Sequence, residues 1–254
     1  MPENDWKTAI TEVAPGRIRI RGYDIIDIME KLSYAEAVFL VLKGELPTKG
    51  EAEMMRAILV SSIDHGCSAP SVLSARNIIA AGNSLNAAVA GGVLAIGDSH
   101  GGAVEQAARI LQEWGGKEGD IERLAERLVD EFQMKKKRIP GFGHLLHNID
   151  PRTGKLFEVA ERSGFFGRHV KLCLAVERVL EHALGKSLPI NIDGAIAAVI
   201  SDMGFEWRLG KGFFILSRVP GLIAHAYEEM IREKPLHQLG RTDCRYDGPG
   251  EREI

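Results

Sequence analysis

The chain has 254 residues, of which 45% are hydrophobic and 26% charged, and its formal net charge is −3. This composition is typical of a folded globular protein and excludes disordered, collagen-like and disulfide-framed chains. Because basic residues do not outnumber acidic ones, no overall positive field attracts nucleic acid or an anionic membrane. Glycine alone is in excess, since the 28 glycines make up about 11% of the chain against a usual ~7%.

The sequence carries no sign of membrane insertion or export. No apolar run reaches the ~18 residues of a membrane span, and the first residues lack the order of a signal peptide. We therefore expect a cytoplasmic protein. Its cysteines, Cys67, Cys173 and Cys244, are too few and too far apart for a disulfide framework, so we expect reduced thiols.

Helix signals follow one another along the chain. Ser33–Glu36 and Thr48–Glu51 each have the pattern of a capping box before an apolar stretch, and Gly44 is placed to end the first helix. Only residues 17–20 alternate as a strand does. The sequence therefore predicts an all-α protein, with further helices at residues 71–83, 84–97, 102–114, 121–137, 153–163, 167–186, 193–203 and 211–233.

The predicted helix at residues 84–97 is built almost wholly of small side chains. We expect it to pack close to its neighbours, in the centre of its domain. No internal repeat, low-complexity tract or flexible linker divides the chain, so composition alone does not locate a domain boundary.

Polar residues beside glycines or short turns form five candidate sites. Glycine at such places lets a ligand approach backbone N–H groups. Each candidate has a structural alternative, because a lone histidine can be a hydrogen-bonded structural residue and Asp193 can be a plain helix N-cap. The five candidates are Asp64–Gly66, Asp98–Gly102, Pro140–His144 with Asp150–Arg152, Asn191–Gly194, and Ser217–Arg218.

Four cations, Lys135–Arg138, precede the glycine loop Pro140–Gly143. They complement the dipole at a helix end, and a phosphate-bearing ligand entering the loop would also meet them. His144, His147 and Asp150 are possible metal ligands, but no established metal-site spacing surrounds them, so we expect no metal. The motifs of serine hydrolases, P-loop NTPases and Rossmann dehydrogenases are absent.

Taken together, these motifs resemble the citrate synthase superfamily over nearly the whole chain. In the family's order the chain contains RGYDI (21–25), LKGELPT (42–48), SHGGA (99–103), IPGFGH to DPR (139–152), NIDG (191–194) and SRVPGLIAH (217–225). In detail it looks closer to the citryl-CoA lyase module that closes ATP-citrate lyase than to the longer condensing synthases.

The resemblance implies an all-α homodimer, or a higher homo-oligomer, with the site in a cleft between two domains. Residues 1–102 and 206–254 would form the large domain on the oxaloacetate side, and residues 103–205 the small domain on the coenzyme A side. It implies citryl-CoA, acetyl-CoA and oxaloacetate as substrates, with coenzyme A arriving as a thioester and with no bound cofactor or metal.

The resemblance also assigns residues by position. His100 matches the histidine that hydrogen-bonds the thioester oxygen, His144 the one at the oxaloacetate carbonyl or citryl hydroxyl, and Asp193 the acid/base at the acetyl methyl carbon. His65, Arg152 and Arg218 match groups that hold the oxaloacetate carboxylates. The coenzyme A region is matched by Lys137, Arg138, Pro140, Gly141, Phe142 and Gly143.

These roles fit elementary chemistry. A carboxylate with a reference pKa of about 4 cannot deprotonate a thioester methyl group by basicity alone, so a donor is needed where the enolate charge develops. A histidine beside two glycines at a helix start, as His100 is, can stay neutral and donate from one ring nitrogen. Arg152 and Arg218 can hold the two oxaloacetate carboxylates in bidentate fashion.

Two segments depart from the condensing synthases. His144 is followed by Leu145 where many of those enzymes carry an arginine, which removes one expected contact to coenzyme A. The C-terminal arginine that crosses the dimer is represented only by Lys234–His237, with Arg241 and Arg245 further on. Citryl-CoA cleavage is therefore the function that the resemblance favours. The alternatives are a citrate or 2-methylcitrate synthase and a non-catalytic subunit that binds coenzyme A thioesters within a larger lyase.

Overall fold

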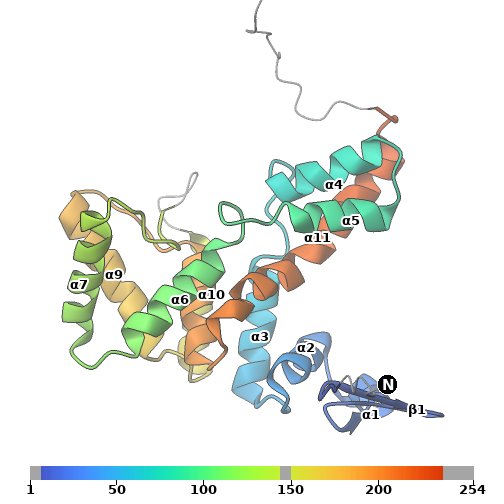
Figure 1. The fold of residues 1–254 in the computed structure, drawn as a ribbon, viewed down its shortest axis with the longest axis horizontal. Coiled ribbons are helices and arrows are strands. Elements are labelled where there is room, and N and C mark those ends of the chain that lie inside the picture. Colours follow the sequence, from blue (N-terminus) through green and yellow to red (C-terminus); the bar gives the residue numbers. More distant parts are fainter. Residues whose placement is uncertain (1–6, 144–149, 237–254) are drawn as a thin grey trace, which may run out of the picture. The chain divides into compact units, whose positions relative to one another are not determined.

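A computed structural model describes residues 7–143 and 150–236. The chain divides into two compact units, Met1–Asp64 with Ile96–Val219 and His65–Ala95 with Pro220–Ile254. The described residues are mostly helical, which confirms the all-α prediction (Figure 1). The predicted boundaries of a large and a small domain stay a prediction.

The first unit opens with a small antiparallel sheet in the order β1-β2-β3. β1 (Thr11–Ala14), β2 (Arg17–Ile20) and β3 (Tyr23–Asp24) are joined by tight turns at Gly16 and Gly22, which both have positive φ. The strand predicted at residues 17–20 is confirmed, while β1, β3 and the short helix α1 (Ile25–Lys31) were not predicted. These elements are short and mostly exposed, so they leave little periodic pattern in the sequence.

The next two helices begin and end as their caps dictate. α2 (Tyr34–Lys43) and α3 (Lys49–Ser61) both start with a complete capping box, formed by Ser33 with Glu36 and by Thr48 with Glu51. α2 ends at Gly44, whose φ of 93° is the left-handed conformation of a glycine cap. Both predicted helices are therefore confirmed.

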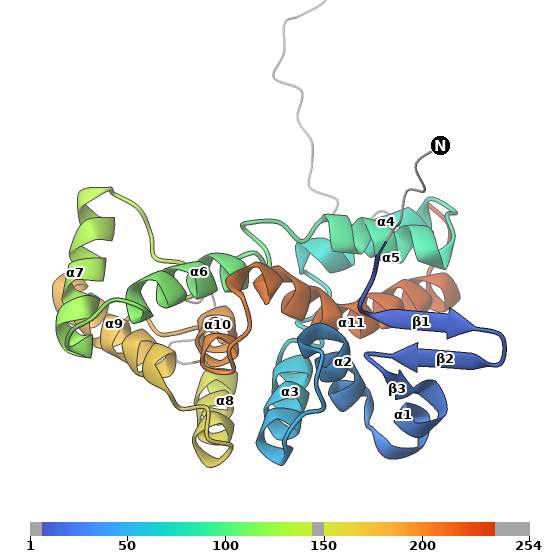
Figure 2. The same cartoon turned by 60° about the horizontal axis from the view of Figure 1, so that its bottom comes forward.

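Helix α10 (Ile192–Asp202) lies at the centre of the first unit. It packs against α6 (Ala103–Gly115), α8 (Pro151–Arg162) and α9 (Arg168–Leu184), and α7 (Ile121–Met134) packs against α9 (Figure 2). Nearly all of α10 is buried, because its side chains are small or apolar on every face. The 3-10 turn η1 (Trp207–Leu209), which was not predicted, leads into α11 (Gly210–Arg232).

The second unit consists of α4 (Pro70–Ala80), α5 (Leu85–Leu94) and the part of α11 that follows Val219. As predicted, α5 packs closely: a Cβ at Gly92 would lie 2.9 Å from Leu222 and 3.0 Å from the Ser71 carbonyl oxygen. The expected central position of this helix is wrong, because only Ala88 and Gly92 of α5 are buried. Its packing face is glycine and alanine, but its outer face is exposed.

The structure shows the state of two of the three cysteines. Cys67 is exposed and Cys173 buried, and both are free thiols, as predicted; Cys244 lies outside the described residues.

None of the helices within residues 7–143 and 150–236 is both long and apolar enough to span a membrane. The expected cytoplasmic location stays a prediction.

Two helical glycines give a matched test of packing. A Cβ at Gly194 would lie 2.3 Å from the carbonyl oxygen of Gly141, a backbone atom, whereas a Cβ at Gly154 would meet open space. Gly194→Ala should therefore lower the free energy of unfolding by about 1–3 kcal/mol. Gly154→Ala should raise it by up to about 1 kcal/mol, because alanine favours the helix. Urea unfolding of both variants checks this, and equal effects of one sign would contradict it.

Candidate active site

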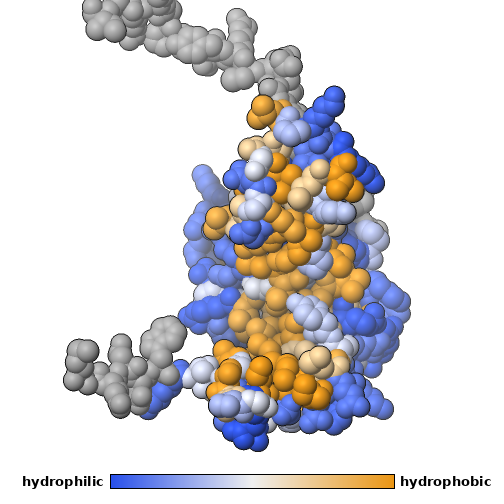
Figure 3. All heavy atoms as spheres, turned by 90° about the vertical axis from the view of Figure 1, so that its right-hand side faces the viewer, coloured by the Kyte–Doolittle hydropathy of each residue, from blue (hydrophilic) through white to orange (hydrophobic). Residues whose placement is uncertain are grey.

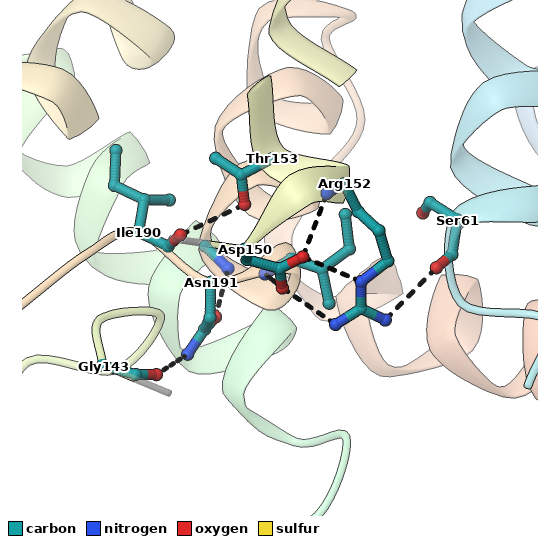
Figure 4. A network of polar contacts seen from close by, with 9 residues as sticks. Ser61, Gly143, Asp150, Arg152, Thr153, Ile190 and Asn191 are labelled. Carbon is teal, nitrogen blue, oxygen red and sulfur yellow. Dashed lines mark hydrogen bonds and ion pairs between the residues drawn. The ribbon is translucent and has the colours of Figure 1, made fainter. Parts of the chain in front are cut away.

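The glycine loop at residues 140–143 lies directly on the first turn of α10. Gly141 and Gly143 both have φ of +89°, which only glycine adopts readily. The Asn191 backbone N–H donates to the Gly141 oxygen at 3.0 Å. The Asn191 Nδ2 donates to the Gly143 oxygen at 2.9 Å (Figure 4). The glycine loop and the NIDG segment, which are separate in the sequence, thus form one structure.

Asp150 joins this structure to α8. Its carboxylate is buried and accepts hydrogen bonds from Nε and Nη2 of Arg152 at 2.9 and 2.8 Å (Figure 4). It also accepts from the backbone N–H groups of Arg152 and Ile192, at 3.0 and 3.1 Å, and so caps α8 and contacts the start of α10. Burial alone would raise the pKa of Asp150, but the contacts with Arg152 and Ile192 outweigh it and hold the pKa below its usual value.

Asp150 lies in the predicted candidate segment Asp150–Arg152 and was weighed as a metal ligand, but its role in orienting Arg152 was not predicted. The signal that could have identified it is local: an aspartate before a proline is the pattern of an N-cap followed by Pro at the first helical position. The third contact of Arg152 is to α3, where Nη1 donates to the Ser61 carbonyl oxygen at 3.4 Å.

Arg218 is a buried cation on α11. Its Nε donates to the Ser62 carbonyl oxygen at 3.1 Å, and its guanidinium lies 4.9 Å from the centre of the Phe214 ring. Its Nη1 is buried and has no hydrogen-bond partner within the described part of the chain. Burial lowers the pKa of Arg218, against the opposite effect of Asp64 and Asp193. An anion that reached this N–H would satisfy it and stabilise the charge.

Asp193 lies in the first turn of α10, within electrostatic reach of both arginines. Burial raises its pKa to about 6, although Arg152 and Arg218 act to lower it and Asp150 adds to the rise. The alternative reading of Asp193 as an N-cap is wrong, because Asn191 caps α10 by accepting from the Gly194 N–H at 3.1 Å. Asp193 is thus available for chemistry and can carry or release a proton near neutral pH.

His100 is placed next to Phe214, the residue that also contacts Arg218. Its ring meets Phe214 edge-on, with centroids 5.8 Å apart, and its backbone N–H donates to the Gly97 oxygen at 2.9 Å. Gly101 has φ of +80°, and a Cβ there would lie 2.4 Å from the Phe214 ring. The glycine therefore lets His100 approach the ring at the N-terminal side of α6.

Two of the predicted residues, His65 and His144, are not part of the arrangement described so far. His65 belongs to the second unit, where it is exposed in the loop before α4, and His144 lies outside the described residues. Their part in the site stays a prediction. Over residues 7–143 and 150–236, His, Cys, Asp and Glu side chains form no cluster that could hold a metal ion.

All of the predicted coenzyme A residues except Gly141 line one or both of two cavities. Lys137 and Arg138 are exposed and contribute to both. One cavity, of about 580 Å³, also includes Pro140, and the other, of about 570 Å³, includes Phe142 and Gly143. Gly141 is buried against α10 and lines neither cavity, so its part is to shape the loop.

Comparison with known proteins agrees with this geometry. Residues 48–242 match the family described as "Citrate synthase, C-terminal domain". The chain belongs to the citrate synthase family. The resemblance read from the motifs is thereby confirmed.

Three relatives illustrate the range of this family. A solved structure of citryl-CoA lyase from Hydrogenobacter thermophilus is 47% identical, with a TM-score of 0.92 over 99% of this chain and 98% of that one. ATP citrate lyase from Methanothrix soehngenii, solved with citrate and coenzyme A, is 25% identical, with a TM-score of 0.84 over 99% of this chain but 43% of that one. Citrate synthase 2 of Bacillus subtilis is 29% identical over 100% of this chain and 68% of its own length.

The raised pKa of Asp193 predicts a pH-dependent stability. Between about pH 4 and pH 6 the native state keeps a proton that the unfolded state loses, so Asp193 lowers stability as pH rises through this window, by about 2–3 kcal/mol. Asp193→Asn cannot ionise, so the variant should gain stability relative to the wild type from pH 4 to pH 6, and the difference should level off above pH 7. Urea unfolding of both proteins at each pH checks this; a difference that does not vary with pH would contradict the raised pKa.

Proposed function

We propose that this chain is a citryl-CoA lyase, which cleaves citryl-CoA to acetyl-CoA and oxaloacetate and can run the reaction in reverse. The observation that carries the proposal is the cluster of Asp193, Arg152 and Arg218, in which a buried carboxyl group of near-neutral pKa lies within electrostatic reach of two guanidinium groups. The 47% identity with the Hydrogenobacter citryl-CoA lyase, over nearly the full length of both chains, supports it.

The two arginines suit the dicarboxylate half of the substrate. Arg152 is oriented by Asp150, and a quarter of its side chain remains exposed for a ligand. Arg218 offers the buried N–H that lacks a partner within the described residues. Two guanidinium groups on different helices can hold two carboxylates in fixed positions, which orients the carbon–carbon bond that breaks.

The cleavage uses the three proposed catalytic residues. His144 accepts the proton of the citryl hydroxyl group, the carbon–carbon bond opens, and oxaloacetate forms with a new carbonyl. The electron pair of that bond passes into the thioester to give an enolate, whose oxygen accepts a hydrogen bond from His100. Asp193, protonated, then gives its proton to the enolate carbon to form acetyl-CoA. A pKa of about 6 suits Asp193 for this transfer near neutral pH.

Coenzyme A lies, in this proposal, against the glycine loop and the basic residues before it. The relative from Methanothrix soehngenii was solved with citrate and coenzyme A. Lys137 and Arg138, with Lys135 nearby, give the rim of both cavities cations for the phosphate groups, and Phe142 gives an apolar surface. No cofactor takes part in any of these steps.

A direct assay tests the function. Purified protein should convert citryl-CoA to acetyl-CoA and oxaloacetate. Asp193→Asn should lower kcat by about 100-fold or more, because it cannot supply the proton. Asp130→Asn, which alters an exposed carboxylate on α7, should leave kcat unchanged.

Product analysis separates the alternatives. Release of citrate and free coenzyme A from acetyl-CoA and oxaloacetate would favour a condensing synthase, and a propionyl-CoA reaction would favour a 2-methylcitrate synthase. Binding of citryl-CoA without turnover would favour the non-catalytic subunit. Full activity of Asp193→Asn would overturn the proposed role of that residue.

We further propose that the protein is a homo-oligomer that associates through the second unit. The C-terminal half of α11 exposes Ile223, Tyr227, Met230 and Ile231 at helical spacing, and each is between 42% and 61% exposed. Hydrophobic residues gather on the face seen in Figure 3. An apolar helix face of this kind is typical of an interface between subunits.

The oligomer is testable by sedimentation velocity. Tyr227→Asp places a charge in the centre of the exposed stripe and should shift the wild-type oligomer toward monomer. Tyr34→Asp, at a tyrosine that is 73% exposed on α2 in the first unit, serves as the matched control and should leave the mass unchanged. A wild-type protein that sediments as a monomer would rule out the interface.

A further inference from the structure

A groove separates α3 from α8 in the first unit. The two helices lie side by side (Figure 2). They run in opposite directions, because the start of α8 contacts the end of α3 and the end of α8 contacts the start of α3. At one end Arg162 of α8 binds Glu53 of α3, with Nε to Oε1 at 2.9 Å, and at the other Arg152 binds the Ser61 carbonyl oxygen. Between these two contacts the helices enclose a cavity of about 350 Å³.

The groove has an apolar floor. Ala57, Val60, Leu156 and Val159 line it, and Val60 is 56% exposed although it belongs to a helix that is otherwise well packed. The lining residues of α8 run from Pro151 to Arg162, which is roughly 16 Å of helix. The groove therefore follows α8, and Val60 contributes most of its exposed apolar surface, because Leu156 and Val159 are buried.

The charged residues that line the groove are all cationic, and Ser61 is the neutral polar residue among them. Arg56, Arg152, Lys155 and Arg162 contribute to it, and none of the described residues that line it is acidic. Lys155 and Arg162 are paired with Glu158 and Glu53 at the rim. Arg56 has no hydrogen bond or ion pair to any residue in the described ranges and is exposed at the groove.

From this combination we propose that the groove binds a medium-chain carboxylate, with its head at Arg56 and Arg152 and its chain on the apolar floor. A cavity of about 350 Å³ lies near the lower limit of ligand pockets, roughly 300 Å³, and is too small for coenzyme A. An inorganic anion would leave the apolar side chains of the groove uncovered, whereas a neutral lipid would leave Arg56 without a hydrogen bond or ion pair to the described residues. A short amphipathic acid covers the apolar side chains with its chain and gives Arg56 an anionic partner with its head.

The groove is linked to citryl-CoA cleavage through Arg152, and this link rests on the proposed function. Arg152 holds the substrate carboxylate in that proposal, and the same guanidinium lines the groove. A carboxylate in the groove gives Arg152 a second anionic partner and draws its side chain from the substrate position. The bound acid therefore acts as an inhibitor that raises KM.

Direct binding decides the proposal independently of activity. Octanoate, titrated by calorimetry into the full-length protein, should bind saturably with one molecule per chain. Acetate, which has only the head group, and octanol, which has only the chain, should bind at least about tenfold more weakly. No saturable octanoate binding, or equal binding of octanol, would overturn the proposal.

Variants at exposed residues locate the site. Arg56→Gln should weaken octanoate binding by about tenfold or more. Val60→Asp should abolish binding, and Arg123→Gln, an exposed cation on α7, should leave it unchanged. Retained binding in both groove variants would place the acid elsewhere and overturn the proposal, provided thermal unfolding shows both variants folded.

Turnover then tests the coupling. Octanoate should raise the KM for citryl-CoA in the wild type but not in Arg56→Gln, whose activity without octanoate should equal that of the wild type. Inhibition that persists in Arg56→Gln would overturn the coupling. If no citryl-CoA turnover is found at all, the proposed function fails, while the binding measurement still decides whether the groove takes a carboxylate.

Discussion

The bidentate contact between Asp150 and Arg152 is the interaction on which the rest of the site depends. The Asp150 carboxylate is buried and caps α8, orients the Arg152 guanidinium and accepts the N–H of Ile192 at the start of α10. A buried carboxylate is stable only when its oxygens are satisfied, so the pair fixes the relative position of these two helices. The place of Asp193, one residue after Ile192, follows from it.

The pKa of Asp193 is set by burial and by neighbouring charged groups rather than by the ordinary value of an aspartate. Burial raises its pKa, and the two guanidinium groups limit the rise, so the value of about 6 is a balance of opposed effects. Asp150 remains ionised because Arg152 neutralises it directly, whereas Asp193 has cations within electrostatic reach but forms no ion pair with any residue in the described ranges. Two carboxyl groups in one site thus differ in pKa because their contacts differ.

Much of the fold follows from local sequence signals. Ser33 and Thr48 predict their helices because a capping box acts within four residues, and the apolar character of α10 predicts a buried helix. The exposure of α5 was not predictable, since small residues suit a buried helix and a packing face equally. The pairing of Asp150 with Ile192 was also out of reach, because it joins residues 42 positions apart in the sequence. His65 and His144 stand beside glycines in motifs that indicate a functional site, but a motif does not say where its residues lie in the folded protein.

Arg152 and Arg218 differ in burial and in hydrogen bonding, and therefore in what an anion would gain from each. Arg152 is already neutralised by Asp150, so a ligand gains orientation from it more than charge. Arg218 is buried, and its Nη1 lacks a hydrogen-bond partner within residues 7–143 and 150–236, so its desolvation is compensated only in part. A carboxylate that binds Arg218 therefore relieves a cost that the folded protein carries without ligand. This cost supports the proposal that Arg218 of α11, far along the chain from the glycine loop, binds the dicarboxylate together with Arg152.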